Sequence, residues 1–99
     1  MPNLFVIKLN YTAAIEKIDE QLVPHRSYLD YCYQQGHYLA SGPQIPRSGG
    51  IIIAKADSKD QIDILMAQDP FMIHQLATYE VIEFAPVKSI DGIKAWLDT

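Results

Sequence analysis

The sequence predicts an α+β fold of the ferredoxin-like type, in which a four-stranded antiparallel sheet carries two helices on one face. Apolar, β-branched runs of strand length alternate with segments of helical periodicity in the order strand, helix, strand, strand, helix, strand. Glycine and proline separate these segments. A chain of 99 residues has room for one hydrophobic core, so we expect a single domain over residues 1–99.

The first half of the chain predicts a strand and an interrupted helix. Apolar residues fall on both alternating faces of residues 3–9, which indicates a strand covered on both sides. Thr12 is a candidate N-cap for the helix that follows. Because Pro24 offers no amide hydrogen, it is expected to interrupt this helix and to begin a second segment over residues 24–35, ended by Gly36.

The second half repeats this pattern. The β-branched run over residues 51–54 is typical of a strand, and a flexible loop with prolines and glycines, residues 44–50, precedes it. Ser58 and Gln61 form a capping box, so a helix is expected from Lys59. Three further segments complete the prediction: a short strand over residues 37–41, a last strand over residues 78–87, and a short amphipathic helix within residues 89–98, from which Trp96 is free to anchor on another surface.

Both faces of the predicted sheet are apolar, as Leu4, Val6, Ile51 and Ile53 indicate. Two helices cover one face only, and burial of apolar surface contributes about 25 cal/mol per Å². We therefore expect a homodimer that forms through the open sheet face. The alternative is that the C-terminal segment folds back over the open face of its own subunit.

Composition narrows the classes of function. The chain has 8 basic and 12 acidic residues, a formal net charge of −4, and arginine only at Arg26 and Arg47. No basic stripe is available for a phosphate backbone, so we expect no nucleic acid partner. The single cysteine, Cys32, is typical of a buried thiol in a reducing compartment. No segment has the pattern of a signal peptide or the length to cross a bilayer, so we expect a cytoplasmic protein without membrane contact.

A histidine interrupts the apolar face of the first helical region. Apolar residues recur there at helical spacing: Ile15, Ile18, Leu22, Leu29 and Cys32. His25 lies on the same face. An inward histidine can hydrogen-bond through one ring nitrogen and keep the other for proton transfer, or it can be a core residue tied to a backbone carbonyl.

A carboxylate occupies the equivalent place in the second helical region. Ile62, Leu65 and Met66 form the inward stripe, and the next position of that stripe is Asp69. The two helices lie side by side above one sheet, so we predict a pair of His25 and Asp69 in which the carboxylate fixes the imidazole tautomer for general acid or base work. The alternative for Asp69 is a helix-terminal residue that bonds local backbone N–H groups before Pro70.

Several motifs occur in an order that resembles the YciI-like family of small proteins. They are Pro24-His25-Arg26 with Leu29 following, Gly36-x-Tyr38-Leu39-Ala40-Ser41-Gly42-Pro43, the capped second helix, and Asp69-Pro70-Phe71. The resemblance implies a dimeric α/β-barrel-type assembly, with His25 and Asp69 as the catalytic pair. A related protein removes chloride from a chlorinated hydroxyhydroquinone, and muconolactone isomerases have a similar fold, so the resemblance also implies proton transfer on a small organic compound without a metal or an organic cofactor.

Five further residues are candidates for substrate binding. Tyr28, Tyr38 and Phe71 are predicted as apolar walls, and Ser41 and Arg26 as polar or anionic contacts. Each has another interpretation, because the aromatic residues are equally suited to packing, Ser41 to a turn, and Arg26 to an outward, solvated position.

Two classes of function follow. The first is a cofactor-independent lyase or isomerase in which His25 and Asp69 move a proton on a small organic molecule, such as an aromatic or dienol compound. The second is a non-catalytic dimeric module that binds a small molecule or has a structural role. No metal is expected, because the spacing of His25, Cys32 and Asp69 matches no zinc pattern. Cys32 is a poor candidate nucleophile, because burial among apolar groups disfavours a thiolate.

Overall fold

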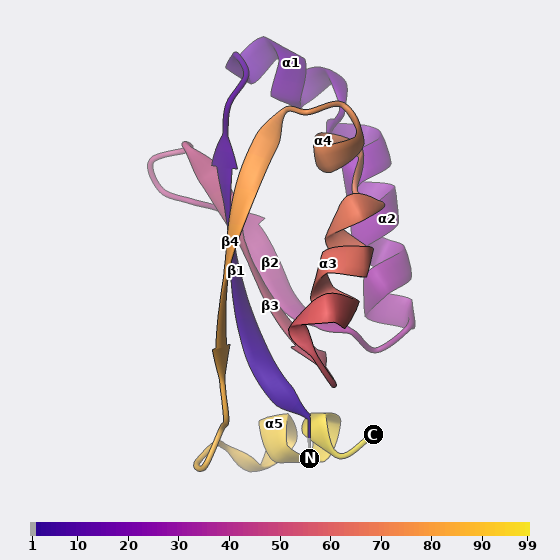
Figure 1. Cartoon of the computed structure of the whole chain (residues 1–99), viewed down its shortest axis with the longest axis vertical. Coiled ribbons are helices and arrows are strands. Elements are labelled where there is room, and N and C mark those ends of the chain that lie inside the picture. The colour runs from indigo at the N-terminus through magenta and orange to yellow at the C-terminus, as the bar shows by residue number, and fades with distance from the viewer. Residues whose placement is uncertain (1) are drawn as a thin grey trace.

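The computed structural model describes residues 2–99 and contains a four-stranded sheet in the order β2-β3-β1-β4 (Figure 1). All three strand pairs are antiparallel. The elements in chain order are β1 (Asn3–Tyr11), α1 (Ile15–Glu20), α2 (Leu22–Gln34), β2 (Tyr38–Pro43), β3 (Gly49–Ala56), α3 (Lys59–Ala67), α4 (Pro70–Ile73), β4 (Ala77–Phe84) and α5 (Asp91–Leu97). This order confirms the predicted ferredoxin-like α+β fold.

One face of the sheet packs on the helices. Figure 1 shows α2 and α3 side by side on that face, with α4 following α3 at one end. The core between the layers contains alternate residues of β1 and β3 and the inward stripes of the helices, among them Phe5, Ile7, Leu9, Ile52, Ala54, Ile18, Cys32, Ile62 and Met66. Each of these side chains is at most 3% exposed, so the predicted helical stripes are confirmed, apart from Ile15, which is 37% exposed at the start of α1.

The first helical region is interrupted at Gln21, within the expected stretch of residues 21–23, and its second helix begins two residues before the expected start at Pro24. α1 ends at Glu20, and α2 begins at Leu22, which makes Pro24 the third residue of α2. The first N–H groups of a helix have no partner within the helix, so proline is tolerated there without loss of a hydrogen bond. Thr12 is not an N-cap, because α1 begins at Ile15 after Ala14, and the Thr12 amide instead donates to the Leu76 carbonyl at 2.9 Å.

The second helical region begins where the capping box predicts. The Gln61 amide donates to Ser58 Oγ at 3.3 Å, and Gln61 Oε1 accepts from the Asp57 amide at 3.1 Å. α3 therefore starts at Lys59, with its Gln61 amide satisfied by the cap and the Gln61 side chain bonded to the residue before the cap. Within residues 2–99 no helix combines the length and apolar character that crossing a bilayer would require.

Two strands begin or end at other residues than predicted, because backbone pairing with β1, and not local composition, determines where they start and stop. β3 begins at Gly49, which pairs with Asn10 of β1, so the predicted loop shortens to residues 44–48. A Cβ on Gly49 would lie 1.8 Å from the Leu9 carbonyl oxygen, so only glycine allows this close approach. β4 ends at Phe84, opposite Leu4, because β1 offers hardly any backbone beyond that point.

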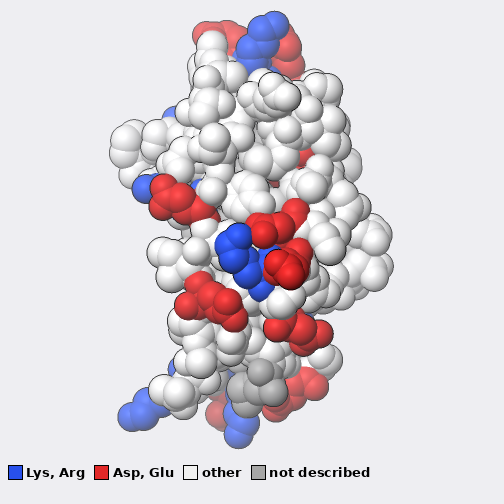
Figure 2. All heavy atoms as spheres, in the orientation of Figure 1, with Lys and Arg blue, Asp and Glu red and all other residues white. Residues whose placement is uncertain are grey.

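The second face of the sheet is apolar and only partly covered. Val6 of β1 is opposite Ile53 of β3 and Ile82 of β4, so these three side chains share that face. Ile82 is 61% exposed. We call the patch made by Val6, Ile53, Ile82 and Phe84 the open face. Figure 2 shows that, on the side it draws, acidic and basic side chains are interspersed without a continuous basic patch.

The C-terminal helix covers one end of this face. The Lys55 ammonium donates to the Trp96 carbonyl and to Thr99 Oγ1, and lies 4.8 Å from the centre of the Trp96 ring. Leu97 of α5 is buried, as are Lys55 and its register partner Leu4. Trp96 thus contacts the sheet through Lys55, and α5 docks at the end of the sheet of its own chain (Figure 1).

Candidate functional site

A histidine and an aspartate meet between α2 and the turn after α3. His25 Nδ1 lies 2.9 Å from Asp69 Oδ1. The Asp69 side chain is completely buried, and that of His25 is 12% exposed. Because an ionised carboxylate only accepts hydrogen bonds, Nδ1 is the donor and carries the proton. Nε2 is then the ring nitrogen available to a molecule that enters the site.

Asp69 is held in place by its own backbone as well as by His25. It is the N-cap of α4, Pro70 is the first residue of that helix, and Asp69 Oδ1 accepts from the Phe71 amide at 2.9 Å. Asp69 lies two residues beyond the end of α3 in an extended conformation, so the cap on α4 and the bond to His25, and not the phase of α3, hold its carboxylate toward α2. One carboxylate oxygen, Asp69 Oδ1, therefore accepts both the hydrogen bond from His25 and the hydrogen bond that caps α4.

An aromatic ring fixes the plane of the imidazole. The rings of His25 and Phe71 are stacked, with centroids 3.9 Å apart and planes 9° from parallel. Tyr11 packs its ring edgewise on Phe71 at 6.1 Å. One face of the imidazole is thus closed by Phe71, and its orientation is set by a hydrogen bond and by a stacking contact at once.

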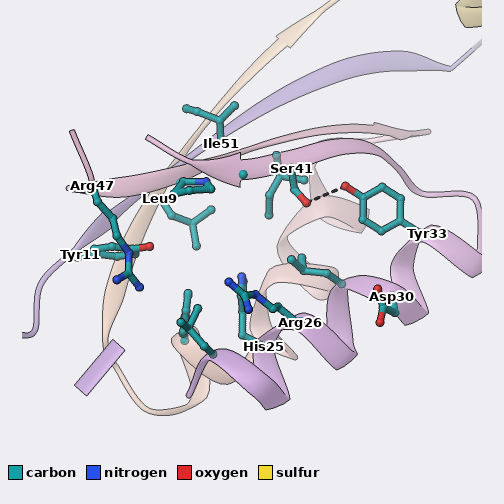
Figure 3. Close-up of a pocket in the computed structure, with 16 residues that line it drawn as sticks. Leu9, Tyr11, His25, Arg26, Asp30, Tyr33, Ser41, Arg47 and Ile51 are labelled. Carbon is teal, nitrogen blue, oxygen red and sulfur yellow. Dashed lines mark hydrogen bonds between the residues drawn. The ribbon is translucent and has the colours of Figure 1, made fainter. Parts of the chain in front are cut away.

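The His25 side chain lines a cavity of about 620 Å³ between α2 and the sheet. Figure 3 shows His25 and Arg26 rising from α2 toward the sheet, with Arg47 and Tyr11 at one end and the hydrogen-bonded Ser41 and Tyr33 at the other. Ser41 Oγ and Tyr33 OH are 2.7 Å apart. A cavity of this size, apolar with a few polar groups, suits a small organic molecule.

The structure places three of the five candidate substrate contacts in this cavity. Arg26, Ser41 and Phe71 line it, whereas Tyr28 and Tyr38 do not. The Tyr28 hydroxyl donates to the Leu65 carbonyl at 2.7 Å and so joins α2 to the end of α3. The Tyr38 hydroxyl lies 4.0 Å from the Met66 sulfur, and its side chain is buried in the core.

Tyr28 and Tyr38 belong to an internal cluster around Cys32 and Asp69. Burial raises the pKa of both phenols and of the Cys32 thiol, and the Asp69 charge raises all three further. These groups therefore stay protonated near neutral pH and supply neither a base nor a thiolate nucleophile. Asp69 Oδ2 is buried, with no hydrogen-bond partner among residues 2–99, so the carboxylate relies on His25 and the Phe71 amide.

The cavity also contains residues that the sequence did not indicate. Tyr11 and Tyr33 contribute from β1 and α2, and Arg47 from the loop before β3. Arg47 is held by an ion pair to Asp19, 2.7 Å, with its guanidinium 5.9 Å from the centre of the Tyr11 ring. The only signal in the sequence was the scarcity of arginine. Within residues 2–99 no group of three His, Cys, Asp or Glu side chains is arranged to hold a metal ion.

The sheet order, the two-helix layer and the buried pair at a cavity define a ferredoxin-like α+β protein with one candidate site. The model of the YCII-related domain matches residues 3–85. The chain therefore belongs to the family of YCII-related domain proteins, in agreement with the resemblance seen in its motifs.

Solved structures share this fold at low sequence identity. One is the 5-chloro-2-hydroxyhydroquinone dehydrochlorinase TftG of Burkholderia phenoliruptrix AC1100, in complex with 2,5-dihydroxybenzoquinone, with 20% identity, a TM-score of 0.72, and coverage of 82% of this chain and 92% of that one. Another is SnoaB of Streptomyces nogalater, a cofactor-independent oxygenase, with 14% identity, a TM-score of 0.51, and coverage of 91% and 97%. Comparison with curated proteins gives no match.

Proposed function

We propose that this protein is a cofactor-independent enzyme in which His25, oriented by Asp69, moves a proton on a small organic substrate in a lyase or isomerase reaction. The observation that carries this proposal is the hydrogen bond between His25 Nδ1 and Oδ1 of the buried Asp69 carboxylate, at the wall of a cavity. A buried carboxylate that fixes one tautomer leaves the second nitrogen with a lone pair at the substrate. This is the arrangement that general base catalysis requires.

The chemical step follows from the tautomer. The Nε2 lone pair takes a proton from an acidic carbon of the substrate, and the electron pair of the broken C–H bond forms a new double bond. In an elimination that pair expels a leaving anion, and the imidazolium returns its proton to solvent. In an isomerisation the imidazolium returns the proton to another atom of the substrate. Asp69 stabilises the imidazolium in both cases. The stacked Phe71 ring holds the imidazole so that Nε2 faces the substrate.

The names of the related structures support this class of substrate. TftG is named a dehydrochlorinase of a chlorinated hydroxyhydroquinone, and its structure holds 2,5-dihydroxybenzoquinone. SnoaB is named a cofactor-independent oxygenase. We therefore propose an aromatic or dienol compound of one ring, with Arg26, Ser41 and Phe71 as substrate contacts and Tyr28 and Tyr38 supporting the site from behind.

A non-catalytic module that binds a small molecule is the second candidate. It is favoured by the hydrogen bond from the Phe71 amide to Asp69 Oδ1, because this contact gives the carboxylate a structural reason to be buried. In that case His25 is a satisfied polar group of the cavity wall and the cavity binds without turnover.

A proton-exchange assay separates the two candidates. The protein is incubated in D2O with 5-chloro-2-hydroxyhydroquinone or muconolactone, and NMR follows deuterium incorporation and product formation while an electrode follows chloride. We expect turnover by the native protein and a loss of about 10²- to 10⁴-fold in His25→Gln and Asp69→Asn. His74→Gln, which changes an exposed histidine beside α4, is the matched control and keeps the native rate.

Two results count against the enzyme. If His25→Gln and Asp69→Asn both fold and both react at the native rate, the two residues have no role in catalysis. Binding of both compounds to the native protein without any exchange or product would leave the binding module as the function.

We also propose that two copies associate through the open face. Ile82 is 61% and Phe84 44% exposed, and α5 reaches only the Leu4 and Lys55 end of the sheet. A second copy offers an identical apolar face, which a two-fold axis brings into register with the first. A partner copy would bury side chains that otherwise meet water.

A further inference from the structure

The arginines of this acidic chain both lie at the cavity. The formal net charge is −4, and both arginines of the sequence, Arg26 and Arg47, line the one cavity that holds His25. The nine residues from Leu22 to Asp30 include Arg26 as their only basic side chain besides His25. The arginines come from α2 and from the loop before β3, so the fold brings them together from distant parts of the chain (Figure 3).

The two arginines differ in their partners. Arg47 is neutralised by Asp19 at 2.7 Å and packed on Tyr11, so its charge already has a counter-ion. Arg26 forms no ion pair with any carboxylate among residues 2–99. Asp30, one turn further along α2, lines the same cavity but does not pair with it. Arg26 is thus the cavity cation whose charge is available to a ligand.

We infer that the site selects small planar anions, and that Arg26 is the residue that determines this specificity by binding a carboxylate or enolate oxygen beside His25. The inference deepens the proposed function and rests on it for the reaction, though not for binding. A guanidinium offers several N–H donors in a plane and pairs well with an anionic oxygen. An anion there also lies near the imidazole, because the His25 and Arg26 side chains both reach from α2 into the same cavity (Figure 3).

The position of the charge suits the proposed chemistry. When a base takes a proton from carbon, negative charge develops on a conjugated oxygen of the substrate. A cation at the neighbouring residue stabilises that charge as it forms, while Asp69 stabilises the imidazolium on the other side. The far end of the cavity, with the Ser41 and Tyr33 hydroxyls 2.7 Å apart, is neutral and suits a hydroxyl group of the same ligand.

A matched pair of ligands tests the inference without turnover. 4-Hydroxybenzoate and 4-hydroxybenzamide have nearly the same shape and differ in charge at one end. Dissociation constants from ¹H–¹⁵N NMR titrations of the native protein are expected to favour the benzoate about tenfold, which corresponds to about 1.4 kcal/mol. In Arg26→Gln the preference falls to near parity, while affinity for the amide is kept.

Two further variants complete the design. Lys94→Gln removes the same charge from exposed α5 and is expected to keep the native preference. Arg47→Gln is expected to lower it less than Arg26→Gln, because Arg47 is already paired with Asp19. Equal affinity of the native protein for both ligands, binding of neither, or an unchanged preference in Arg26→Gln would overturn the inference. If the preference is present but the proton-exchange assay finds no turnover, the anion site stands and the proposed reaction fails.

Discussion

At the scale of single residues, Asp69 joins two functions in one oxygen atom. Oδ1 accepts a hydrogen bond from the His25 ring and another from the Phe71 amide, both at 2.9 Å. Removing the carboxylate therefore affects the orientation of the imidazole and the start of α4 together. The two contributions can be separated, because an asparagine also caps a helix whereas an alanine does not.

We predict that Asp69→Ala lowers the free energy of unfolding by about 1–3 kcal/mol, because it leaves the buried Phe71 amide without an acceptor. Asp69→Asn keeps an acceptor at that amide and is expected to cost clearly less. Urea denaturation followed by circular dichroism measures both values, with Asp98→Ala, an exposed aspartate, as the control. Equal losses in the two Asp69 variants would show that the capping contact contributes nothing.

Helical phase made His25 predictable, because His25 lies within α2 and shares the inward side of that helix. Asp69 was placed near it by extending the stripe of α3, but Asp69 lies beyond the end of α3, and its direction is set by the cap that it forms on α4. Tyr28 and Tyr38 show the limit of this reasoning. An aromatic residue on an inward stripe has the same pattern whether it faces a cavity or the core. Arg47 was missed because its position depends on Asp19, which is 28 residues away.

At the scale of elements, the sequence predicted their type and order better than their ends. The helix that starts at Lys59 was located correctly, because the capping box is a local signal. The start of β3 at Gly49 could not be predicted, because it depends on the close approach of Leu9 in another strand. Composition marks glycines as loop residues, and here pairing between strands overrides that preference.

A hydrogen bond between elements gives the protein a pH-dependent stability. Tyr79 of β4 donates its hydroxyl to Asp63 of α3 at 2.7 Å. Burial and this hydrogen bond raise the pKa of Tyr79 to about 12, from an ordinary value of 10.0. Between these two values the tyrosine keeps its proton when folded and loses it when unfolded. Unfolding therefore releases a proton, and stability present below pH 10 is lost as the pH rises toward 12.

We predict that Tyr79→Phe makes this alkaline loss of stability shallower, because phenylalanine has no proton to release. The measurement is the urea midpoint of the native and variant proteins at a series of pH values from neutral to strongly alkaline. Tyr31→Phe, which changes a half-exposed tyrosine of α2, is the control and is expected to follow the native curve. A Tyr79→Phe curve parallel to the native one would contradict the linkage.

At the scale of the whole molecule, the sheet has one face covered by helices and one that is largely apolar and open. The C-terminal helix docks at the Lys55 end through Leu97 and leaves Val6, Ile53, Ile82 and Phe84 beyond it. The C-terminal segment, which was the alternative to a dimer, therefore covers the open side of the sheet at one end only. We propose that a second copy of the chain covers the remaining part of the open face.

We predict that Ile82→Lys converts the proposed dimer to a folded monomer, because a lysine at a residue 61% exposed in one chain can stay solvated only if the partner is absent. Sedimentation velocity measures the change in mass. Ile64→Lys is the matched control, since Ile64 is 63% exposed on α3, on the opposite side of the molecule. A native protein that sediments as a monomer, or a variant that still sediments as a dimer, would refute the proposed association.

The separation of His25 and Asp69 along the chain has a consequence for how the site forms. The two residues are 44 positions apart, and neither α2 nor α3 alone can bring them together. Their contact requires the loop between them to close, which costs chain entropy that only the assembled core repays. The pair therefore forms only in molecules in which α2 and the turn after α3 have packed together on the sheet. Hydrogen exchange at the Phe71 amide, which Asp69 holds, then reports whether a molecule is competent for chemistry.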